Sequence, residues 1–308
     1  MTMTRAETLR RLLRPGAAVA IPGVPDPIIA ELARRAGYSA VYVSGSVIAS
    51  QVYGLPDIGL VTATESVRRA GEIAQATSLP VIADADTGYG NALNVIRTVG
   101  DFIRAGVAGI HLEDQEFPKR CGHVEGKRVI DAGEAAAKIR AAVEARRQAG
   151  DIYLIARIDA RAVEGFDAAV ERARLYVEAG ADAVFPEALQ SEAEFARFAE
   201  ALPGVPLIAN MTEFGKSPLL PLERFRAWGY AAVIFPVTVY RAMLHTARQL
   251  LEDLARHGTQ VGWLDRMLTR RELYELNHYS RWVAWDGAFV PGGGTPPLRE
   301  GWPLDHGR

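Results

Sequence analysis

The chain of 308 residues has a single cysteine and almost no net charge. One thiol cannot form an intramolecular disulfide, which is typical of proteins from a reducing compartment. Acidic and basic residues nearly balance, at 37 and 35, so the composition does not favour nucleic acid or an anionic membrane surface as a partner. An anionic ligand would therefore have to be held by local positive groups.

Long hydrophobic runs are also missing. No stretch approaches the roughly 20 apolar residues of a membrane span, and residues 1–14 lack the apolar segment of a signal peptide. We therefore expect a cytoplasmic protein with neither a membrane nor a nucleic-acid partner. About half of the residues are apolar, which is enough for a large core.

Short apolar segments recur along the chain and predict strands. Their nearly continuous apolar character suits a parallel sheet that is covered on both faces. The eight segments are Ala17–Ile21, Ala40–Val43, Pro80–Ala83, Gly109–Leu112, Ile152–Ala156, Ala183–Phe185, Pro206–Ala209 and Ala231–Phe235.

Amphipathic segments lie between these strands and predict helices, because their apolar residues recur at three-to-four spacing. Several end in Ala-Gly, where glycine is the expected helix C-cap. The segments are Asp26–Ala36, Ala63–Ala76, Leu93–Ala105, Glu134–Gln148, Phe166–Ala179, Glu192–Ala201 and Leu222–Trp228.

Eight strand–helix repeats predict a (β/α)₈ TIM barrel of the α/β class. An open doubly wound sheet is the alternative, but no G-x-G-x-x-G follows the first strand. Two further helices are expected at Val239–Arg256 and Leu264–Trp285. Residues 1–290 would form one catalytic domain with these extra C-terminal helices, followed by a Gly/Pro-rich tail at 291–308.

Reactive side chains gather after the predicted strands, where active sites of such barrels lie. The segments concerned are Ser44-Gly45-Ser46, Asp84 to Gly90, Glu113-Asp114-Gln115, Arg157-Ile158-Asp159, Glu187, and Asn210 to Glu213. Random placement would not bring carboxylates to four strand ends at one rim.

Four acids predict a metal site: Asp84, Asp86 and Glu113 from these segments, and Asp57 from the loop after the second strand. Carboxylates crowded into one cavity repel each other unless a cation neutralises them. Hard oxygen ligands favour Mg²⁺, for which Mn²⁺ can substitute. Helix caps and surface ion pairs are the alternative, but they would explain only one or two of the four.

Cys121 is the candidate proton-transfer residue. It lies in a long polar segment with Lys119, Arg120 and His123, and neighbouring cations are expected to lower the pKa of its thiol towards neutrality. Gly122 and Gly126 would give this segment the flexibility of a closing lid. The alternative is that the lone cysteine is a small buried packing residue.

Positive and neutral donors at the rim could hold carboxylate groups of a ligand. Arg157 presents a fork suited to a carboxylate, or it pairs with Asp159 or Glu187. Asn210 and Thr212 offer neutral donors, and Arg241 lies at the start of the next helix. His111 could orient a ligand from the core or take part directly.

Six segments in this order resemble the isocitrate lyase / phosphoenolpyruvate mutase superfamily over nearly the whole chain. They are Tyr42-Val43-Ser44-Gly45, Gly54-Leu55-Pro56-Asp57, Asp84 to Gly90, His111 to Gln115, Lys119-Arg120-Cys121-Gly122-His123 and Thr212-Glu213-Phe214-Gly215. The Lys-Arg-Cys-Gly-His segment resembles the lyase branch, whereas the phosphonate-forming mutases lack this cysteine.

The resemblance implies a role for each site residue. Asp84 would ligate Mg²⁺ directly, and Asp86, Asp57 and Glu113 would act mostly through water. Cys121, His123 and Lys119 would be catalytic. Substrate would be bound by Ser44, Gly45, Ser46, Gly122, Arg157, Glu187, Asn210, Thr212, Arg241 and Arg270. The family also implies a homotetramer, a dimer of dimers, whose C-terminal helices are exchanged between neighbours.

The implied activity is Mg²⁺-dependent cleavage of a carbon–carbon bond in a small hydroxy-carboxylate. Ala162-Val163-Glu164-Gly165 and Phe185-Pro186-Glu187-Ala188 are similar to 2-methylisocitrate lyases, which release succinate and pyruvate. Val124, Ser46-Val47 and Ile158 depart from that pattern, so a 2,3-dimethylmalate or other alkylmalate lyase and an oxaloacetate hydrolase stay open. A phosphonate-type mutase or hydrolase and a non-catalytic binding protein are the rival classes.

Overall fold

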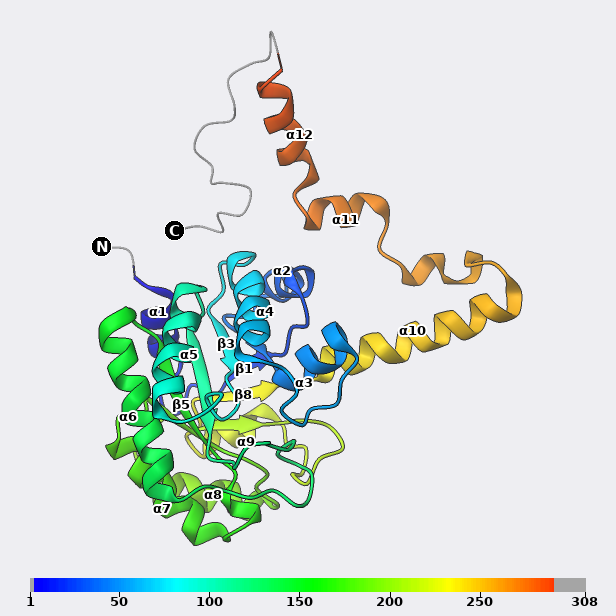
Figure 1. The fold of residues 1–308 in the computed structure, drawn as a ribbon. Helices are drawn as coiled ribbons and strands as arrows, with labels where there is room; N and C mark the ends of the chain where they lie inside the picture. Colours follow the sequence, from blue (N-terminus) through cyan, green and yellow to red (C-terminus); the bar gives the residue numbers. More distant parts are fainter. Residues whose placement is uncertain (1–2, 291–308) are drawn as a thin grey trace.

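The computed structural model describes residues 3–290, and its strands are all parallel (Figure 1). They are β1 (Val19–Pro22), β2 (Val41–Val43), β3 (Val81–Asp84), β4 (Gly109–Glu113), β5 (Tyr153–Ile158), β6 (Ala183–Pro186), β7 (Ile208–Asn210) and β8 (Ala232–Phe235). Each overlaps one of the apolar segments predicted to form a strand.

The strands close into a barrel. One sheet has the order β2-β3-β4-β5-β6 and the other β1-β8-β7. Single parallel bridges, Gly23 with Tyr42 and Val184 with Leu207, join the two sheets at both edges. The predicted (β/α)₈ barrel is therefore confirmed, and the open sheet is excluded.

Helices follow the strands and cover the barrel. They are α2 (Pro27–Arg35), α4 (Ala63–Gln75), α5 (Ala92–Arg104), α6 (Ala132–Ala149), α7 (Phe166–Glu178), α8 (Glu192–Ala201) and α9 (Leu222–Ala227), with short helical turns α3 (Gly45–Val47), η1 (Ile48–Val52) and η2 (Ala160–Ala162) after β2 and β5. Reciprocal capping by Thr62 and Glu65 begins α4. Gly106 follows α5 with φ of 84°, as the Ala-Gly signal predicted.

A helix that the sequence did not suggest, α1 (Arg5–Leu12), closes the N-terminal end of the barrel. Its Leu9, together with the adjoining Leu13, packs with residues of the barrel interior such as Ile82 and Tyr153. A Cβ at Gly109 would lie 2.8 Å from Leu9 Cδ2, so a larger residue there would displace the leucine side chain. The second apolar cluster fills the space between the strands and the outer helices.

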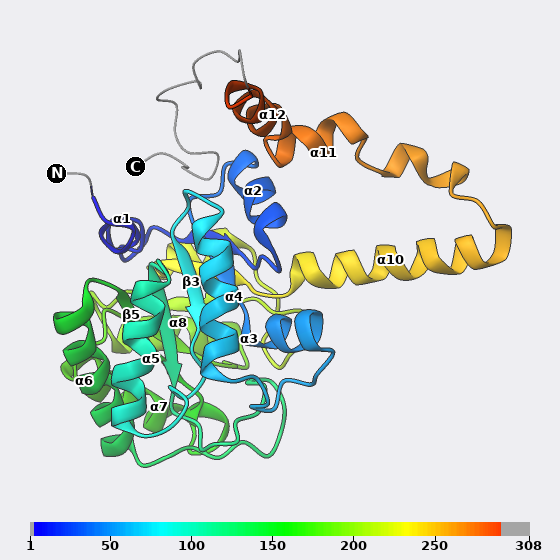
Figure 2. The same cartoon turned by 45° about the horizontal axis from the view of Figure 1, so that its top comes forward.

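The C-terminal helices leave the barrel as an arm, residues 238–290 (Figures 1 and 2). Helix α10 (Thr238–His257) runs outward and has no buried residue. The single helix expected at Leu264–Trp285 is wrong: the segment forms η3 (Val261–Arg266), α11 (Arg270–Leu276) and α12 (Tyr279–Ala288). Met267 is extended, and His278 is left-handed with φ of 57°, so the helix is interrupted twice.

No helix within residues 3–290 is both long and apolar enough to cross a membrane. The tail predicted at 291–308 lies outside the described residues.

Candidate active site

The predicted site residues come together at the C-terminal end of the barrel. Asp84 ends β3, Glu113 ends β4, Asn210 ends β7, and Glu187 directly follows β6. Arg157 is the last residue but one of β5. All five side chains are buried, and four of them are ionisable groups, which are rarely buried without partners.

Asp84 is held by backbone amides. Its Oδ1 accepts a hydrogen bond from Asp86 N at 3.0 Å, and its Oδ2 accepts one from Gly45 N at 3.2 Å. A Cβ at Gly45 would lie 2.9 Å from Asp84 Oδ2, so this approach requires glycine. Burial opposes ionisation, but His111, Lys119 and Arg157 lower the pKa of Asp84 to about 2.

Lys119 lies between two of the other predicted metal ligands. Its Nζ is 2.9 Å from Asp86 Oδ1 and also contacts the carboxylate of Asp57. Burial and Asp84 raise the pKa of Asp86 to about 6, although Lys119 opposes the rise. With this lysine between them, the acids within residues 3–290 form no ready group of three metal-ligating side chains.

The chemistry of the donors nevertheless fits a hard divalent cation. Neither oxygen of the buried Glu113 carboxylate accepts a hydrogen bond from the described residues, although Arg157 Nη1 lies 3.1 Å from its Oε2. Burial raises the pKa of Glu113 well above its usual range. A buried carboxylate that lacks hydrogen-bond donors is suited to a cation or to water bound to one.

The guanidinium of Arg157 contacts three carboxylates at this end of the barrel. Its Nε lies 3.0 Å from Asp159 Oδ2, and its Nη2 lies 3.3 Å from Glu187 Oε2. Both pairings that the sequence suggested are therefore present, in addition to Glu113. Three carboxylates hold the fork in place, so it is preoriented for an anionic ligand that reaches this end of the barrel.

Glu187 joins the strand ends to the segment that carries Cys121. His123 Nδ1 accepts a hydrogen bond from Lys216 N at 3.0 Å, and its Nε2 is 2.9 Å from Glu187 Oε1. Asn210 Nδ2 donates to both oxygens of Glu187, at 3.2 and 3.3 Å. Burial opposes ionisation, but Arg157 and His123 hold the pKa of Glu187 well below its usual range.

The expected low pKa of the Cys121 thiol is wrong. Burial, Asp57 and Glu187 together outweigh Arg157 and the His123 backbone amide, so the pKa is raised. The cations near it in sequence are engaged elsewhere, because Lys119 pairs with Asp57 and Asp86, and Arg120 Nη1 donates to Glu125 O at 3.3 Å. The thiol is therefore protonated at neutral pH and is suited to giving up a proton.

Around Cys121 the chain forms a cavity of about 370 Å³. Asp57, Lys119 and Lys127 line it together with the cysteine. Gln115 fixes the segment from the side, because its Oε1 accepts from Arg120 N at 3.0 Å and its Nε2 donates to Arg120 O at 2.8 Å. The half-buried cysteine thus faces space and charge, unlike a packing residue.

Some predicted ligand-binding residues lie apart from this cluster. Arg241 is exposed and pairs with Glu213, 3.3 Å away, with its guanidinium 5.4 Å from the Phe214 ring centroid. Arg270 begins α11 and belongs to the arm, so it is not part of its own chain's cluster. Ser44 and Ser46 face each other with 3.0 Å between their hydroxyl oxygens, and Thr212 N donates to Asn210 Oδ1 at 3.1 Å.

Sequence reasoning missed three buried residues of the site. Tyr42 OH lies 2.7 Å from Nε2 of His111, whose pKa burial lowers to about 4, so this histidine is a neutral core residue beside Asp84. Asp159 was noted only as a possible partner of Arg157. Lys127 contacts both Asp159 and Gly122, and nothing in its sequence context indicates this.

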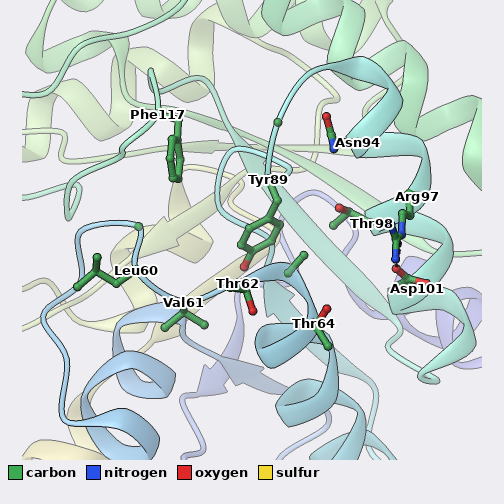
Figure 3. A pocket seen from close by; sticks show the side chains of 13 residues that line it. Leu60, Val61, Thr62, Thr64, Tyr89, Asn94, Arg97, Thr98, Asp101 and Phe117 are labelled. Atoms are coloured by element: carbon green, nitrogen blue, oxygen red, sulfur yellow. Dashed lines mark ion pairs between the residues drawn. The ribbon is translucent and has the colours of Figure 1, made fainter.

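A second cavity, of about 450 Å³, lies between the segment after β3, the beginning of α4 and helix α5 (Figure 3). Tyr89 extends towards Thr62 at the beginning of α4, and Asn94 and Arg97 of α5 form another wall. Tyr89 and Gly90 belong to the segment after β3, but no residue predicted to bind metal or substrate lines this space. The predicted chemistry is therefore confined to the strand ends and the cavity at Cys121.

Comparison with known proteins identifies relatives of this chain. The model of the phosphoenolpyruvate phosphomutase family matches residues 9–255. The chain is 50% identical to a probable 2-methylisocitrate lyase of Corynebacterium glutamicum over 86% of this chain and 87% of the relative. It is 49% identical to 2-methylisocitrate lyase of Aeropyrum pernix, over 88% and 86% of the two chains.

Solved structures also include relatives of this chain. A 2,3-dimethylmalate lyase superimposes with a TM-score of 0.88 at 36% identity, over 97% of this chain and all of that one. Phosphonopyruvate hydrolase in complex with oxalate and Mg²⁺ superimposes with a TM-score of 0.84 at 30% identity, over 94% of this chain and all of that one.

The chain therefore belongs to the phosphoenolpyruvate mutase / isocitrate lyase superfamily. Within it, the relatives place the chain among the carbon–carbon lyases, as the Lys-Arg-Cys-Gly-His segment predicted. The non-catalytic alternative is not supported.

Proposed function

We propose that this chain cleaves 2-methylisocitrate to succinate and pyruvate in a Mg²⁺-dependent reaction. One observation carries the proposal: a protonated, half-buried thiol at Cys121 stands over a rim where Arg157, Glu187 and His123 are joined in one network. The names of the relatives supply the substrate, and the thiol supplies a group that can complete the cleavage.

Asp84 would hold the Mg²⁺ directly, while Asp86, Asp57 and Glu113 would contact it through water. When bound there, the metal supplies a Lewis acid for the hydroxyl and carboxylate of the future 2-oxoacid. Lys119 would have to move away from Asp57 and Asp86, or share them with the bound waters. Mn²⁺ would satisfy the same oxygen donors.

Different side chains would bind the two halves of the substrate. Arg157 with Ser44, Gly45 and Ser46 would bind the oxoacid half. Asn210 and Thr212, beside Glu187, would donate hydrogen bonds to the carboxylate of the other half as it gains negative charge. Gly122, His123 and Lys119 close the site around the thiol, and Arg241 would approach from the rim.

In the cleavage the substrate hydroxyl would lose its proton to solvent and become the carbonyl of pyruvate, while the electron pair of the broken carbon–carbon bond would stay on the carbon of the succinate half. The Cys121 thiol would donate its proton to this carbon, and the thiolate would regain a proton from solvent before the next cycle. The raised pKa of the thiol suits this direction, because the group begins the reaction protonated.

A second candidate substrate is 2,3-dimethylmalate. Val124, directly after the Cys-Gly-His sequence, is exposed and apolar, which would suit a substrate with an alkyl group in place of a carboxylate. The similar 2,3-dimethylmalate lyase structure adds to this candidate.

The arm supports a proposal about assembly. Leu244, Leu251, Leu268, Trp282 and Val283 are exposed in a single chain, although large apolar groups are usually buried. We infer that these helices pack on neighbouring copies in a homotetramer, a dimer of dimers, with residues 1–290 acting as one catalytic unit. Arg270, which lies away from its own cluster, could then serve a neighbour's site. The proposed location of the tetramer is the cytoplasm.

Parallel assays test the proposed function. Purified protein would be mixed with 2-methylisocitrate, 2,3-dimethylmalate, isocitrate and oxaloacetate, each with Mg²⁺, with Mn²⁺ and with EDTA. We expect the fastest cleavage with 2-methylisocitrate, loss of activity in EDTA and recovery with either metal. Full activity in EDTA would contradict the metal assignment, and faster cleavage of another substrate would replace the proposed one.

A further inference from the structure

Lys127 lies where the Cys121 segment meets the charged strand ends. Its Nζ donates to Gly122 O at 2.6 Å and to Asp159 Oδ1 at 2.7 Å. The side chains of Lys127 and Asp159 are 1% and 0% exposed, so the pair is removed from water. A buried ammonium keeps such partners only if they compensate its lost hydration.

The contacts form a closed circuit. Asp159 Oδ2 is 3.0 Å from Arg157 Nε, and Arg157 Nη2 is 3.3 Å from Glu187 Oε2. Glu187 Oε1 is in turn 2.9 Å from Nε2 of His123, the residue after Gly122. The contacts therefore run from the Gly122 carbonyl through Lys127, Asp159, Arg157 and Glu187, and end at His123, the residue after Gly122.

Packing around Gly122 leaves no space for a side chain at this position. A Cβ on Gly122 would lie 2.5 Å from Glu187 Cγ and 2.6 Å from Arg157 Nη2. The peptide beside the cysteine thus rests directly on the arginine and the glutamate. Movement of this peptide and reorientation of Arg157 cannot be independent.

We propose that Lys127 is a positioning residue that couples the place of the Cys121 segment to the orientation of Arg157. The ammonium group satisfies the Gly122 carbonyl and the Asp159 carboxylate together, and Asp159 holds the guanidinium. When the Cys121 segment is in place, Asp159 holds the Arg157 guanidinium in one orientation. When the segment moves away, Asp159 loses its contact with Lys127, one of its two cationic partners. Only the consequence for turnover rests on the proposed function.

The single cysteine of the chain gives a direct test. The rate at which N-ethylmaleimide modifies Cys121 in the full chain should rise when the segment opens, because the thiol is half-buried while the segment is in place. Lys127→Met keeps the length of the side chain but removes the donor. We expect modification to be about tenfold faster or more, the effect of losing a charge-assisted hydrogen bond. Removing a nearby cation disfavours the thiolate, so a faster reaction cannot come from a more reactive sulfur.

Arg128→Met is the matched control, because Arg128 is the next residue, carries the same charge and pairs with Glu116 at the surface. Its modification rate should stay within about twofold of the unaltered protein, as expected for an exposed ion pair. An unchanged rate in Lys127→Met, or an equal acceleration in Arg128→Met, would overturn the proposal.

The double variant Lys127→Met/Asp159→Asn separates positioning from simple charge neutralisation. It leaves no unpaired charge between the two residues, so the melting temperature should recover part of what Lys127→Met loses. Modification of Cys121 should stay fast, because the Gly122 carbonyl still has no donor. If the slow rate returned together with the melting temperature, Lys127 would only neutralise Asp159.

Kinetics complete the test. In Lys127→Met we expect KM for 2-methylisocitrate to rise and kcat to fall, with kcat/KM lower by about ten- to a hundredfold because Arg157 and Cys121 are both misplaced. If the unaltered protein cleaves none of the four substrates, the proposed function fails. The modification rates still decide the role of Lys127 in that case.

Discussion

The rim of the barrel and the C-terminal arm place the same kinds of residue in opposite environments. At the rim, Asp84, Glu113 and Arg157 are buried although they carry charge. In the arm, Leu251 and Trp282 are exposed although they are apolar. Buried charges need partners, and exposed apolar groups tend to be covered. The rim therefore supports the proposal of a bound cation and an anionic substrate, and the arm supports the proposal of contacts between copies.

The largest effect is expected from Asp84→Ala at the rim. Removal of the proposed direct metal ligand should lower turnover at least about a thousandfold, because a Lewis acid contributes several kcal/mol to the transition state. The far-ultraviolet circular dichroism should stay that of the barrel. Asp101→Ala, at a surface carboxylate of α5 that pairs with Arg104, should keep its turnover. An active Asp84→Ala enzyme would move the metal elsewhere.

Cys121→Ser should have the next largest effect. A serine hydroxyl has a pKa too high to exchange a proton near neutrality, so kcat should fall by about 10²- to 10⁴-fold. Binding of Mg²⁺ and of oxalate, measured by calorimetry, should change little. Near-normal turnover with a lower melting temperature would instead show that Cys121 is a packing residue.

Leu251→Arg in α10 tests the arm. If this side chain is buried between copies, its loss should weaken each contact by about 2 kcal/mol, or about thirtyfold in the association constant. Sedimentation velocity over a range of concentrations should then show smaller species. Gln249→Arg, at an exposed polar position of the same helix, should sediment like the unaltered protein. Identical sedimentation of both variants would separate the arm from assembly.

The smallest effect is expected at Glu31 of α2, the helix of the barrel that contacts α11 of the arm. Arg34 Nε and Arg35 Nε lie 2.7 and 2.8 Å from the Glu31 carboxylate, and Arg35 Nη2 donates to Glu275 O of α11 at 2.7 Å. Although burial opposes it, these arginines lower the pKa of Glu31 to about 2. The resulting stability is present above the usual pKa of 4.5 and is lost as the pH falls towards 2.

Glu31→Gln should therefore unfold more easily at pH 7, by about 1 kcal/mol after allowance for solvent screening. The difference from the unaltered protein should shrink as the pH falls from 5 to 3.5 in urea titrations. Glu72→Gln, at an exposed ion pair with Arg69, should show almost no difference at either pH. A difference for Glu31→Gln that does not depend on pH would exclude the ionic explanation.

The sequence predicted the barrel well because buried parallel strands and Ala-Gly helix ends are local signals. It also predicted which residues meet at the rim, since Asp84, Glu113, Arg157 and Asn210 lie at or near their strand ends. It did not predict α1, whose role depends on the space left by Gly109 across the barrel.

The ion pairs of the site could not be predicted from local sequence patterns. The thiol pKa was expected to fall because Lys119 and Arg120 are its neighbours in sequence. In space, Lys119 turns to Asp57, 62 residues away along the chain, and its charge no longer favours the thiolate. Lys127 was overlooked for the same reason, because its importance comes from Asp159, 32 residues further on.

Helix α1 closes the N-terminal end of the barrel, because Leu9 and the adjoining Leu13 fill that end. A ligand of the strand ends would then reach them from the C-terminal end of the barrel, where the Cys121 segment lies. When an enzyme makes two products from one substrate and has one access route to its site, the products are released in a fixed order. If the proposed binding roles hold, the fragment nearer the segment should leave before the fragment held at Asp84 and Arg157. Product inhibition should record this sequence: the product that leaves last should compete with substrate, and the one that leaves first should not.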